Sequence, residues 1–266
     1  MRVWLNGALV AAAEARVDPA DRGLLLGDGV FETLRVAEGR IAHLGRHLAR
    51  LRGAAAFFAM ACPEAATLAG GLEALRAAEA LVEGSLRLTL TRGPAPRGVL
   101  PPAATRPTVL ITAAHGLPAA AGGLRLCIAR STRRNAFSPT ARFKTLNYLD
   151  GIVARREAQQ LGCDDALLRN TEGRLAEATA ANLLWRDRDG AWFTPPVGDG
   201  ALPGIRRAVL VERGLVAERG LDDPAAITSA MLCSSLAVLE VAALGARALA
   251  PDAAALARFR EASDQS

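Results

Sequence analysis

The sequence contains few aromatic residues, few histidines and a single lysine. Aromatic side chains make up 4% of its 266 residues, and there are 3 histidines. The cysteines, Cys62, Cys127, Cys163 and Cys233, are far apart, with no Cys-x-x-Cys pair and no histidine at ligand spacing. This spacing indicates neither a disulfide framework nor a zinc site, so we expect no metal, and reduced thiols as in the cytoplasm.

Segments that would direct the chain to a membrane are also missing. The first ten residues, MRVWLNGALV, lack the apolar core and the cleavage site of a signal peptide. No run approaches the roughly 18 apolar residues of a membrane span. The sequence therefore predicts a soluble cytoplasmic protein without a membrane partner.

Several common catalytic motifs are absent as well. There is no GxxxxGK[ST] phosphate loop, and the GDG at 27–29 is too short for a dinucleotide fingerprint. None of the histidines lies near a GxSxG motif, so a Ser–His–acid triad has no support.

The net charge of +5 raises the question of a nucleic-acid partner. Arginine is scattered over the whole length, and the densest cluster, 130–134, holds only three basic residues. Dispersed charge with few aromatic side chains favours a solvated basic surface over a phosphate-backbone footprint. We therefore predict no nucleic-acid partner.

The sequence does contain enough apolar material for a substantial core. Hydrophobic residues make up 51% of the chain, and at this length we expect two lobes. The segment GLPAAAGG at 116–123 is small and lacks periodicity, which is typical of a linker. We predict a small N-terminal α/β domain at 1–117, a linker at 118–123 and a larger C-terminal domain at 124–266.

Periodicity predicts strands and helices that alternate without regular βαβ spacing, which favours an α+β fold with mixed sheets. Asn6-Gly7 between two apolar runs predicts an N-terminal hairpin. The predicted helices cover 43–60, 65–80, 147–162 and 204–214. The other predicted strands cover 85–93, 107–113 and 124–130, and two further hairpins cover 166–178 and 182–193.

Lys144 is the only lysine in the chain. It lies in TARFKTLNYLDG between a predicted strand and a predicted helix, with Phe143 and Leu146 nearby. An apolar setting lowers the pKa of a lysine, because burial disfavours the charged form, and the neutral amine can then form a Schiff base. A lysine before a helix is usually an ordinary surface residue, so this pattern alone is weak evidence for chemistry.

Two further features gain meaning only in combination. Glu177, at a predicted strand end in LAEATAANLLW, could bond the protonated ring nitrogen of a pyridine cofactor or be an ordinary exposed residue. Gly204 and Ile205 could offer main-chain N–H groups to a phosphate or be a simple helix start. Neither feature decides between its two interpretations by itself.

Lys144, Glu177 and Gly204 follow one another in the chain within longer stretches that match a known family signature. The stretches are EATAANLL, WFTP and LPGIRR, with DRGLLLGDGVFETLR at 21–35, HLARL at 47–51 and KTLNYL from Lys144. Together they resemble the signature of class IV aminotransferases, the fold-type IV pyridoxal phosphate enzymes, over residues 3–245. Leu184 and Trp192 depart from the pattern, but both are hydrophobic. The resemblance implies a D-amino-acid-aminotransferase-like fold of two domains, the larger with a mixed, barrel-like sheet, and a pyridoxal 5′-phosphate cofactor.

The resemblance also implies roles for particular residues. Lys144 would bind the cofactor covalently and then move the α-proton of the substrate. Glu177 would hold the ring nitrogen, and Asn182 would be a structural support. The remaining expected cofactor contacts are Tyr148 at the phenolic oxygen, Leu202 against the ring, and Arg50, Gly204, Ile205 and Ser235 at the phosphate. A homodimer is implied as well.

The residues expected in the substrate pocket leave the reaction open. D-amino-acid aminotransferases have a tyrosine where this chain has Phe31, and Arg-x-His where it has Arg97-Gly98-Val99. Arg97 and Arg35 are therefore the candidates to bind a substrate carboxylate. Branched-chain enzymes tend to have a glycine at the position of Thr33, which argues against that group.

Thr33 and the Arg-Gly at 97–98 resemble 4-amino-4-deoxychorismate lyase instead. Against the lyase, Ser234 stands where that enzyme has an asparagine, and a hydroxyl cannot reproduce the paired donor and acceptor of an amide. We predict amino transfer between a small amino acid, with D-amino acids among the options, and a 2-oxo acid. The alternative is the lyase, which releases pyruvate and 4-aminobenzoate for folate synthesis. A lesser alternative is a family member that binds the cofactor without catalysis.

Overall fold

The computed structural model describes residues 1–117 and 123–264. They form two compact units. The first comprises 1–117 together with Lys144–Asn147, and the second comprises the rest of the described chain. No helix in the described chain combines the length and the apolar character needed to span a bilayer.

The predicted domain boundaries differ from these units in one respect. The C-terminal domain was predicted to carry Lys144, whereas residues 144–147 group with the first unit because Thr145 bridges to Val30. The predicted linker at 118–123 lies outside the described residues except for Gly123. The domain boundaries therefore remain a prediction.

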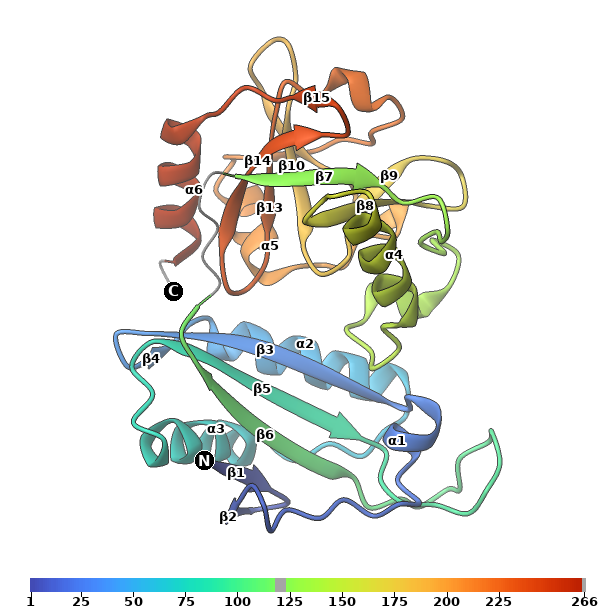
Figure 1. Cartoon of the computed structure of the whole chain (residues 1–266). Coiled ribbons are helices and arrows are strands. Elements are labelled where there is room, and N and C mark those ends of the chain that lie inside the picture. The colour runs from blue at the N-terminus through green and yellow to red at the C-terminus, as the bar shows by residue number, and fades with distance from the viewer. Residues whose placement is uncertain (118–122, 265–266) are drawn as a thin grey trace. The chain divides into compact units, whose positions relative to one another are not determined.

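The first unit is built on a six-stranded antiparallel sheet in the order β2-β1-β6-β5-β3-β4 (Figure 1). Its strands are β1 (Arg2–Leu5), β2 (Ala8–Ala11), β3 (Gly29–Ala37), β4 (Arg40–Ile41), β5 (Gly84–Thr91) and β6 (Thr108–His115). The β1–β2 hairpin turns at Asn6 and Gly7, whose φ angles of 49° and 103° are the left-handed values that an Asn-Gly turn adopts. The predicted N-terminal hairpin is confirmed.

Alternation along the strands separates a buried and a more open face of this sheet. Leu86, Leu88 and Leu90 of β5 are fully buried, whereas Arg87 is exposed. The first unit also contains helices α1 (Arg22–Leu26), α2 (Leu44–Phe57) and α3 (Ala65–Ala78). The two longer helices, α2 and α3, pack on the sheet (Figure 1). The buried face is therefore the one that these helices cover.

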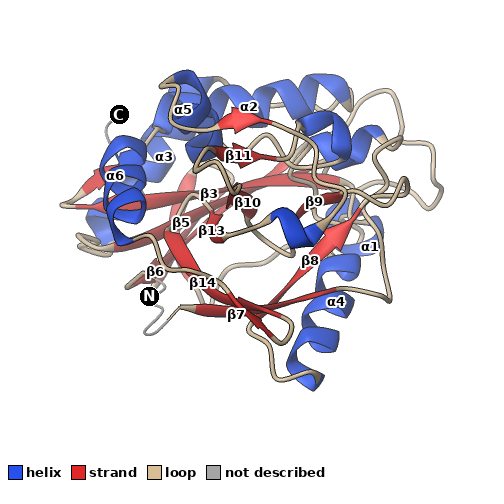
Figure 2. Cartoon of the chain, turned by 90° about the horizontal axis from the view of Figure 1, so that it is seen from above, coloured by secondary structure: helices blue, strands red, loops and turns tan. Residues whose placement is uncertain are grey.

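The second unit contains a barrel. The strand order β12-β11-β10-β13-β14-β7-β8-β9 is completed by a pairing of β9 with β10, so that six strands, from β10 through β13, β14, β7 and β8 to β9, form a closed ring (Figure 2). β7 is parallel to β8 and β14, and the other pairs in the ring are antiparallel, so the sheet is mixed as predicted. The strands are β7 (Leu124–Ile128), β8 (Asp165–Arg169), β9 (Leu175–Ala178), β10 (Asn182–Arg186), β11 (Trp192–Thr194), β12 (Ala217–Glu218), β13 (Ser229–Cys233), β14 (Val238–Leu244) and β15 (Arg247–Ala248).

Side chains from alternate positions fill the barrel and pack its outer surface. On β10, Leu183 and Trp185 belong to the apolar cluster shared with Leu126 and Leu167, whereas Leu184 belongs to the cluster shared with two helices. Those helices are α5 (Ile205–Glu212) and α6 (Ala253–Asp264), and a third helix, α4 (Leu149–Gln160), packs on β7 and β8. The short 3-10 helices are η1 (Pro139–Arg142), η2 (Val197–Asp199) and η3 (Pro224–Ala226).

Most of the predicted elements are confirmed. The predicted helices correspond to α2, α3, α4 and α5, and the two later hairpins correspond to β8–β9 and β10–β11. Strands β3, β13 and β14 and helix α6 were not predicted. β13, for example, is buried at every position, so it lacks the alternation by which a half-buried strand is recognised in a sequence.

Candidate active site

Lys144 is fixed to the beginning of β3 by main-chain hydrogen bonds. The N–H of Phe31 donates to the carbonyl of Lys144 at 2.8 Å, and the N–H of Leu146 donates to the carbonyl of Gly29 at 3.0 Å. The Lys144 side chain is half-buried, and its Nζ lies 4.5 Å from the centroid of the Phe31 ring. The only amine of a lysine side chain in this protein is therefore held against a predicted substrate-pocket residue.

The other predicted pocket residues of β3 share the face of Phe31. Because side chains alternate along a strand, Phe31, Thr33 and Arg35 point to one side. Arg87 of β5 is paired with Thr33 in the antiparallel register, and its guanidinium carbon lies 3.6 Å from the centroid of the Phe31 ring. Arg87 was not predicted, since its position across from Thr33 follows only from the register of two strands more than fifty residues apart.

Arg50, the predicted phosphate-binding arginine, belongs to a buried cluster on the opposite side of β3. Its Nε donates to Glu32 Oε1 at 2.8 Å and its Nη2 to Glu32 Oε2 at 2.6 Å. His47 Nδ1 lies 2.6 Å from Glu32 Oε2, and the side chains of Glu32 and His47 are each 1% exposed. This cluster joins α2 to β3 and fixes the guanidinium of Arg50.

Burial and hydrogen bonding act against each other on the groups of this cluster. Burial raises the pKa of Glu32, but hydrogen bonds from Arg50 and His47 outweigh it and hold that pKa below its usual value. Burial lowers the pKa of His47 below its usual value, although the Glu32 carboxylate opposes this effect. At pH 7 the imidazole is therefore neutral, and its Nδ1–H donates to an ionised carboxylate.

The neutral state of His47 predicts a loss of stability in mild acid. A histidine whose pKa is lowered by folding contributes stability above its unfolded pKa, about 6.5, and this contribution disappears as the pH falls through the lower folded pKa. We expect the unfolding free energy to decrease from pH 7 to pH 5, and the decrease to be smaller in His47→Gln, which keeps a neutral donor. Urea unfolding at several pH values measures this slope. The exposed-residue control, His115→Gln, should lose as much stability between pH 7 and pH 5 as the wild type does. If His47→Gln also loses as much as the wild type, His47 is not the cause of the decrease.

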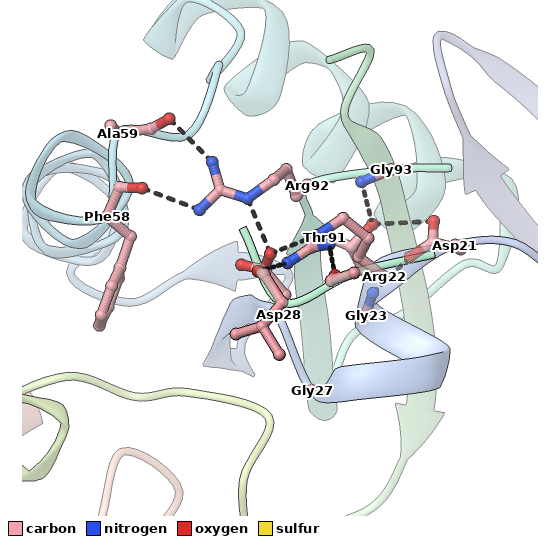
Figure 3. Close-up of polar contacts among 12 residues, drawn as sticks. Asp21, Arg22, Gly23, Gly27, Asp28, Phe58, Ala59, Thr91, Arg92 and Gly93 are labelled. Carbon is pink, nitrogen blue, oxygen red and sulfur yellow. Dashed lines mark hydrogen bonds and ion pairs between the residues drawn. The ribbon is translucent and has the colours of Figure 1, made fainter. Parts of the chain in front are cut away.

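A second polar cluster of the first unit surrounds Asp28 (Figure 3). Arg22 Nε and Arg92 Nε both donate to Asp28 Oδ2, at 2.8 and 2.7 Å. Burial raises the pKa of Asp28, but the hydrogen bonds from Arg92 and Arg22 hold it below its usual value. Two further nitrogens of Arg22 donate to the carbonyls of Gly98 and Val99, both at 2.7 Å. Asp28 thereby orients an arginine that holds the main chain directly after Arg97, the exposed residue predicted to bind a carboxylate.

Asp21 anchors the beginning of α1 next to this cluster (Figure 3). Its Oδ1 accepts from the N–H of Gly23 at 2.7 Å, as expected of an N-cap, and its Oδ2 accepts from Thr91 Oγ1 at 2.9 Å and Thr108 Oγ1 at 2.6 Å. Asp21 is fully buried. The buried carboxylate therefore ties α1 to the ends of β5 and β6.

In the second unit, Glu177 lies at one end of the barrel with three polar partners. Its Oε1 is 3.0 Å from Arg134 Nη2, and its Oε2 accepts from the N–H of Leu202 at 2.9 Å and from Asn182 Nδ2 at 3.3 Å. The side chain is 9% exposed. Arg134 was counted in the sequence only as part of a basic cluster, and its role beside Glu177 becomes visible only in the fold.

Asn182 connects Glu177 to the beginning of α5. Its Nδ2 also donates to the carbonyl of Leu202 at 2.8 Å, which agrees with the predicted structural role. A Cβ on Gly204 would lie 2.0 Å from Asn182 Oδ1, so no larger residue fits there without displacing the amide. Gly204 is the N-cap of α5 and makes no side-chain cap, which leaves the first-turn N–H groups available for an anion.

The structure brings several other predicted residues to this end of the barrel. Asn182 of β10 is paired with Glu177 of β9 and with Cys233 of β13, so these three residues lie side by side across the sheet. Ser234 and Ser235 directly follow Cys233 in the chain. The Ser234 hydroxyl accepts from the N–H groups of Leu236 and Ala237, at 3.2 and 3.3 Å. That oxygen therefore stabilises its own turn.

Tyr148 is the N-cap of α4 and is half-buried. Its carbonyl accepts from the N–H of Ile152 at 2.9 Å. The residues of the second unit fit a pyridine ring with a phosphate, since they provide an oriented carboxylate and a helix N-terminus that no side chain caps.

Comparison with known proteins identifies a single family. The family described as class IV amino-transferase matches residues 29–244. A protein of Methanocaldococcus jannaschii, provisionally assigned as a branched-chain-amino-acid aminotransferase, is 34% identical over 84% of this chain and 77% of its own length. The D-alanine aminotransferase of Listeria innocua is 31% identical over 80% and 74%, and the aminodeoxychorismate lyase of Bacillus subtilis is 28% identical over 79% and 72%.

Solved structures agree with this comparison. The branched-chain aminotransferase of Thermoproteus uzoniensis with norvaline has a TM-score of 0.88 and 26% identity, covering 99% of this chain and 93% of its own. The pyridoxal-phosphate-bound structure of a hypothetical aminotransferase from Mycobacterium tuberculosis has a TM-score of 0.84 and 23% identity, covering 99% and 98%. The chain therefore has the two-domain α+β fold of fold-type IV enzymes, as predicted.

Proposed function

We propose that this chain, which belongs to the class IV aminotransferase family, transfers an amino group between a small amino acid and a 2-oxo acid. The predicted family and its pyridoxal phosphate cofactor are confirmed by the comparisons, and the protein is an enzyme. The choice of substrate and reaction is the part that we propose. The observation that supports amino transfer is that the amine of Lys144 and the guanidinium of Arg87 both lie against the ring of Phe31.

When bound to the protein, the cofactor would withdraw electrons from the α-carbon of the substrate. Lys144 would attach the cofactor and move the α-proton, because its amine is the only lysine nucleophile of the chain. Glu177 would bond the ring nitrogen, and Arg134 keeps its carboxylate oriented. The other proposed cofactor contacts are Arg50, Gly204, Ile205 and Ser235 for the phosphate, Tyr148 for the phenolic oxygen and Leu202 for the ring.

Gly204→Ala provides a test of the phosphate assignment. The added methyl group would displace Asn182 and disturb the N–H groups at the beginning of α5. Losing one charge-assisted hydrogen bond costs about 1.5 kcal/mol, so we expect the cofactor dissociation constant to rise about tenfold. Titration of the cofactor-free protein measures the constant. Gly198→Ala is the matched control, because a Cβ there meets nothing within 4 Å. Equal affinities of the two variants would contradict the assignment.

Arginine side chains on the open face of β3 and β5 support an acidic substrate. Arg87 lies against the Phe31 ring, and Arg35 points to the same side of β3. We propose that Arg87 and Arg35 bind the carboxylate of the amino or oxo acid, with Arg97 as a further candidate. Phe31 and Thr33 would then contact the remainder of the substrate.

The second candidate is aminodeoxychorismate lyase. It is favoured by the resemblance of Thr33 and Arg97-Gly98 to that enzyme and by the Bacillus subtilis relative. The Ser234 hydroxyl, engaged within its own turn, does not supply the donor and acceptor of the asparagine that Ser234 replaces. Amino transfer is therefore the first choice.

A comparison of two half-reactions distinguishes the candidates. We expect D-alanine or an L-amino acid, added to the holoenzyme without an acceptor, to convert the cofactor to its amino form, seen as a change in absorbance. Release of pyruvate from aminodeoxychorismate with the cofactor absorbance unchanged would establish the lyase instead. A holoenzyme that performs neither reaction would indicate that both substrate proposals are wrong.

We further propose that the enzyme is a cytoplasmic homodimer. Apolar side chains that a monomer would leave in water support the dimer. On α1, Leu24, Leu25 and Leu26 are 69%, 57% and 48% exposed, and in the second unit Phe137 and Leu149 are 81% and 76% exposed. Sedimentation equilibrium tests the dimer, and a monomer at micromolar concentration would refute it. The cytoplasmic location rests on the sequence alone.

A further inference from the structure

We propose that the second unit carries an anion-binding pocket, lined by β7, the end of α4 and the β14–β15 turn, which binds a small molecule with two anionic groups. The pocket measures about 790 Å³, a volume within the usual range of small-molecule sites. Its lining strand β7 lies beside β8 and α4 (Figure 1). None of the residues assigned above to the cofactor or the substrate lines it.

The pocket is strongly basic. Five of its fifteen lining residues are arginines, and none of the fifteen is acidic. The arginines are Arg125, Arg130, Arg133, Arg169 and Arg247. None of them forms an ion pair with any residue in 1–117 or 123–264, whereas Arg50, Arg92 and Arg134 each pair with a carboxylate. Four of the pocket arginines are exposed and Arg169 is half-buried, and no ion pair within the described chain offsets their charge.

Neutral acceptors hold some of these guanidinium groups in place. Arg247 donates to the carbonyls of Ile227 and Pro224, both at 2.7 Å. Arg133 donates to the carbonyl of Ala129 at 3.1 Å. Main-chain carbonyls orient a guanidinium without cancelling its charge, and its remaining N–H groups can bind an anion. The guanidinium groups of Arg133 and Arg247 are therefore positioned in advance.

The acidic residues near the pocket are engaged with the main chain. Glu157 accepts from the N–H groups of Arg130 and Ser131 at 2.9 and 3.0 Å. Asp164 accepts from the N–H of Arg125 at 2.7 Å. These carboxylates fix the chain that carries two of the arginines, but they do not line the pocket.

The rest of the lining indicates what kind of anion fits. Ile128, Leu161 and Leu244 add apolar surface, which suits a short carbon frame. The arginines come from separate segments, namely β7 and its following loop, the end of β8 and the start of β15. They can therefore bind two anionic groups of one molecule. Guanidinium groups bind carboxylates and phosphates alike through paired hydrogen bonds. A dicarboxylate and a molecule with two phosphate groups therefore both have the chemistry that this pocket would bind.

Cys163 provides a reporter inside the pocket. It lines the pocket and is half-buried, whereas burial raises the pKa of its neighbour Cys127 to about 11 and keeps that thiol protonated. In the holoenzyme, whose cofactor fills the proposed phosphate site, we expect an anionic methanethiosulfonate reagent to label Cys163 about tenfold faster than a cationic one of similar size. Peptide mass spectrometry separates Cys163 from the other cysteines. Equal rates for the two reagents would overturn the proposal.

Substitutions test whether the arginines cause the preference. In the double variant Arg125→Gln/Arg130→Gln we expect the rate ratio to fall severalfold toward one. Neither guanidinium bonds to the described chain, so the variant keeps the fold, which circular dichroism and activity verify. Arg188→Gln, an exposed arginine outside the pocket, is the matched control and should keep the ratio. A ratio unchanged in the double variant would refute the assignment.

Competition identifies the anionic group. Protection of Cys163 by millimolar pyrophosphate but not succinate indicates a phosphate ligand, and the reverse indicates a dicarboxylate. Protection by both supports a site for either group. Protection by a single-stranded oligonucleotide alone, or by none of the probes, would overturn the proposal of a small-molecule site.

Discussion

Lys144→Ala protein is expected to be colourless and at least about a thousandfold less active than the wild type. The expected loss combines the contribution of a general acid–base group, about 10²–10⁴-fold, with the loss of covalent attachment. The structure gives the replacement little reason to unfold the protein, since the hydrogen bond from the N–H of Phe31 to the carbonyl of residue 144 remains in the variant.

The single lysine makes the measurement unusually direct. Borohydride reduction of the wild-type holoenzyme should fix the cofactor to one lysine-containing peptide, the one that carries Lys144, and to none in Lys144→Ala. Phe143→Leu is a suitable control, because it changes the adjacent residue and keeps the amine. A variant that retains the absorbance band and fixes the cofactor elsewhere would show that Lys144 is not the attachment residue.

The cofactor half of the candidate site was largely predictable from the sequence. Glu177, Asn182, Gly204 and Ile205 lie within thirty residues, and local motifs record them in order. Closure of the barrel through the β9–β10 pair brings Glu177 beside Asn182, a contact that was not predicted. The assignment of these residues to the cofactor remains a prediction.

The partners of those residues could not be read from local sequence. Arg134 pairs with Glu177 across forty-three positions, and Arg87 meets Phe31 only through the β3–β5 register. Such pairs depend on long-range strand pairing, which leaves no periodic signal in either segment. Arg50 was predicted as a phosphate ligand, but its hydrogen bonds to Glu32 on β3 were not predicted. They too depend on a tertiary contact that leaves no signal in the local sequence.

Glu32→Ala is expected to cost about 3–5 kcal/mol of unfolding free energy near pH 7. The carboxylate is ionised and 1% exposed, and its removal takes away the oxygens that accept from the guanidinium of Arg50 and the Nδ1–H of His47. Breaking a buried ion pair by removing one partner costs far more than losing a surface pair, because a buried charge remains uncompensated. Urea unfolding of the cofactor-free protein measures the change without a contribution from cofactor binding.

Glu73→Ala is the matched control for a surface pair. Glu73 is 57% exposed and pairs with Arg76 one helical turn away on α3, so we expect its replacement to change stability by no more than about 0.5 kcal/mol. Similar costs for the two variants would contradict the buried-pair account. If Arg50 also binds the cofactor phosphate, as proposed, Glu32→Ala should weaken cofactor binding as well, because Glu32 fixes the orientation of that guanidinium. Loss of stability with unchanged cofactor affinity would assign Arg50 a purely structural role.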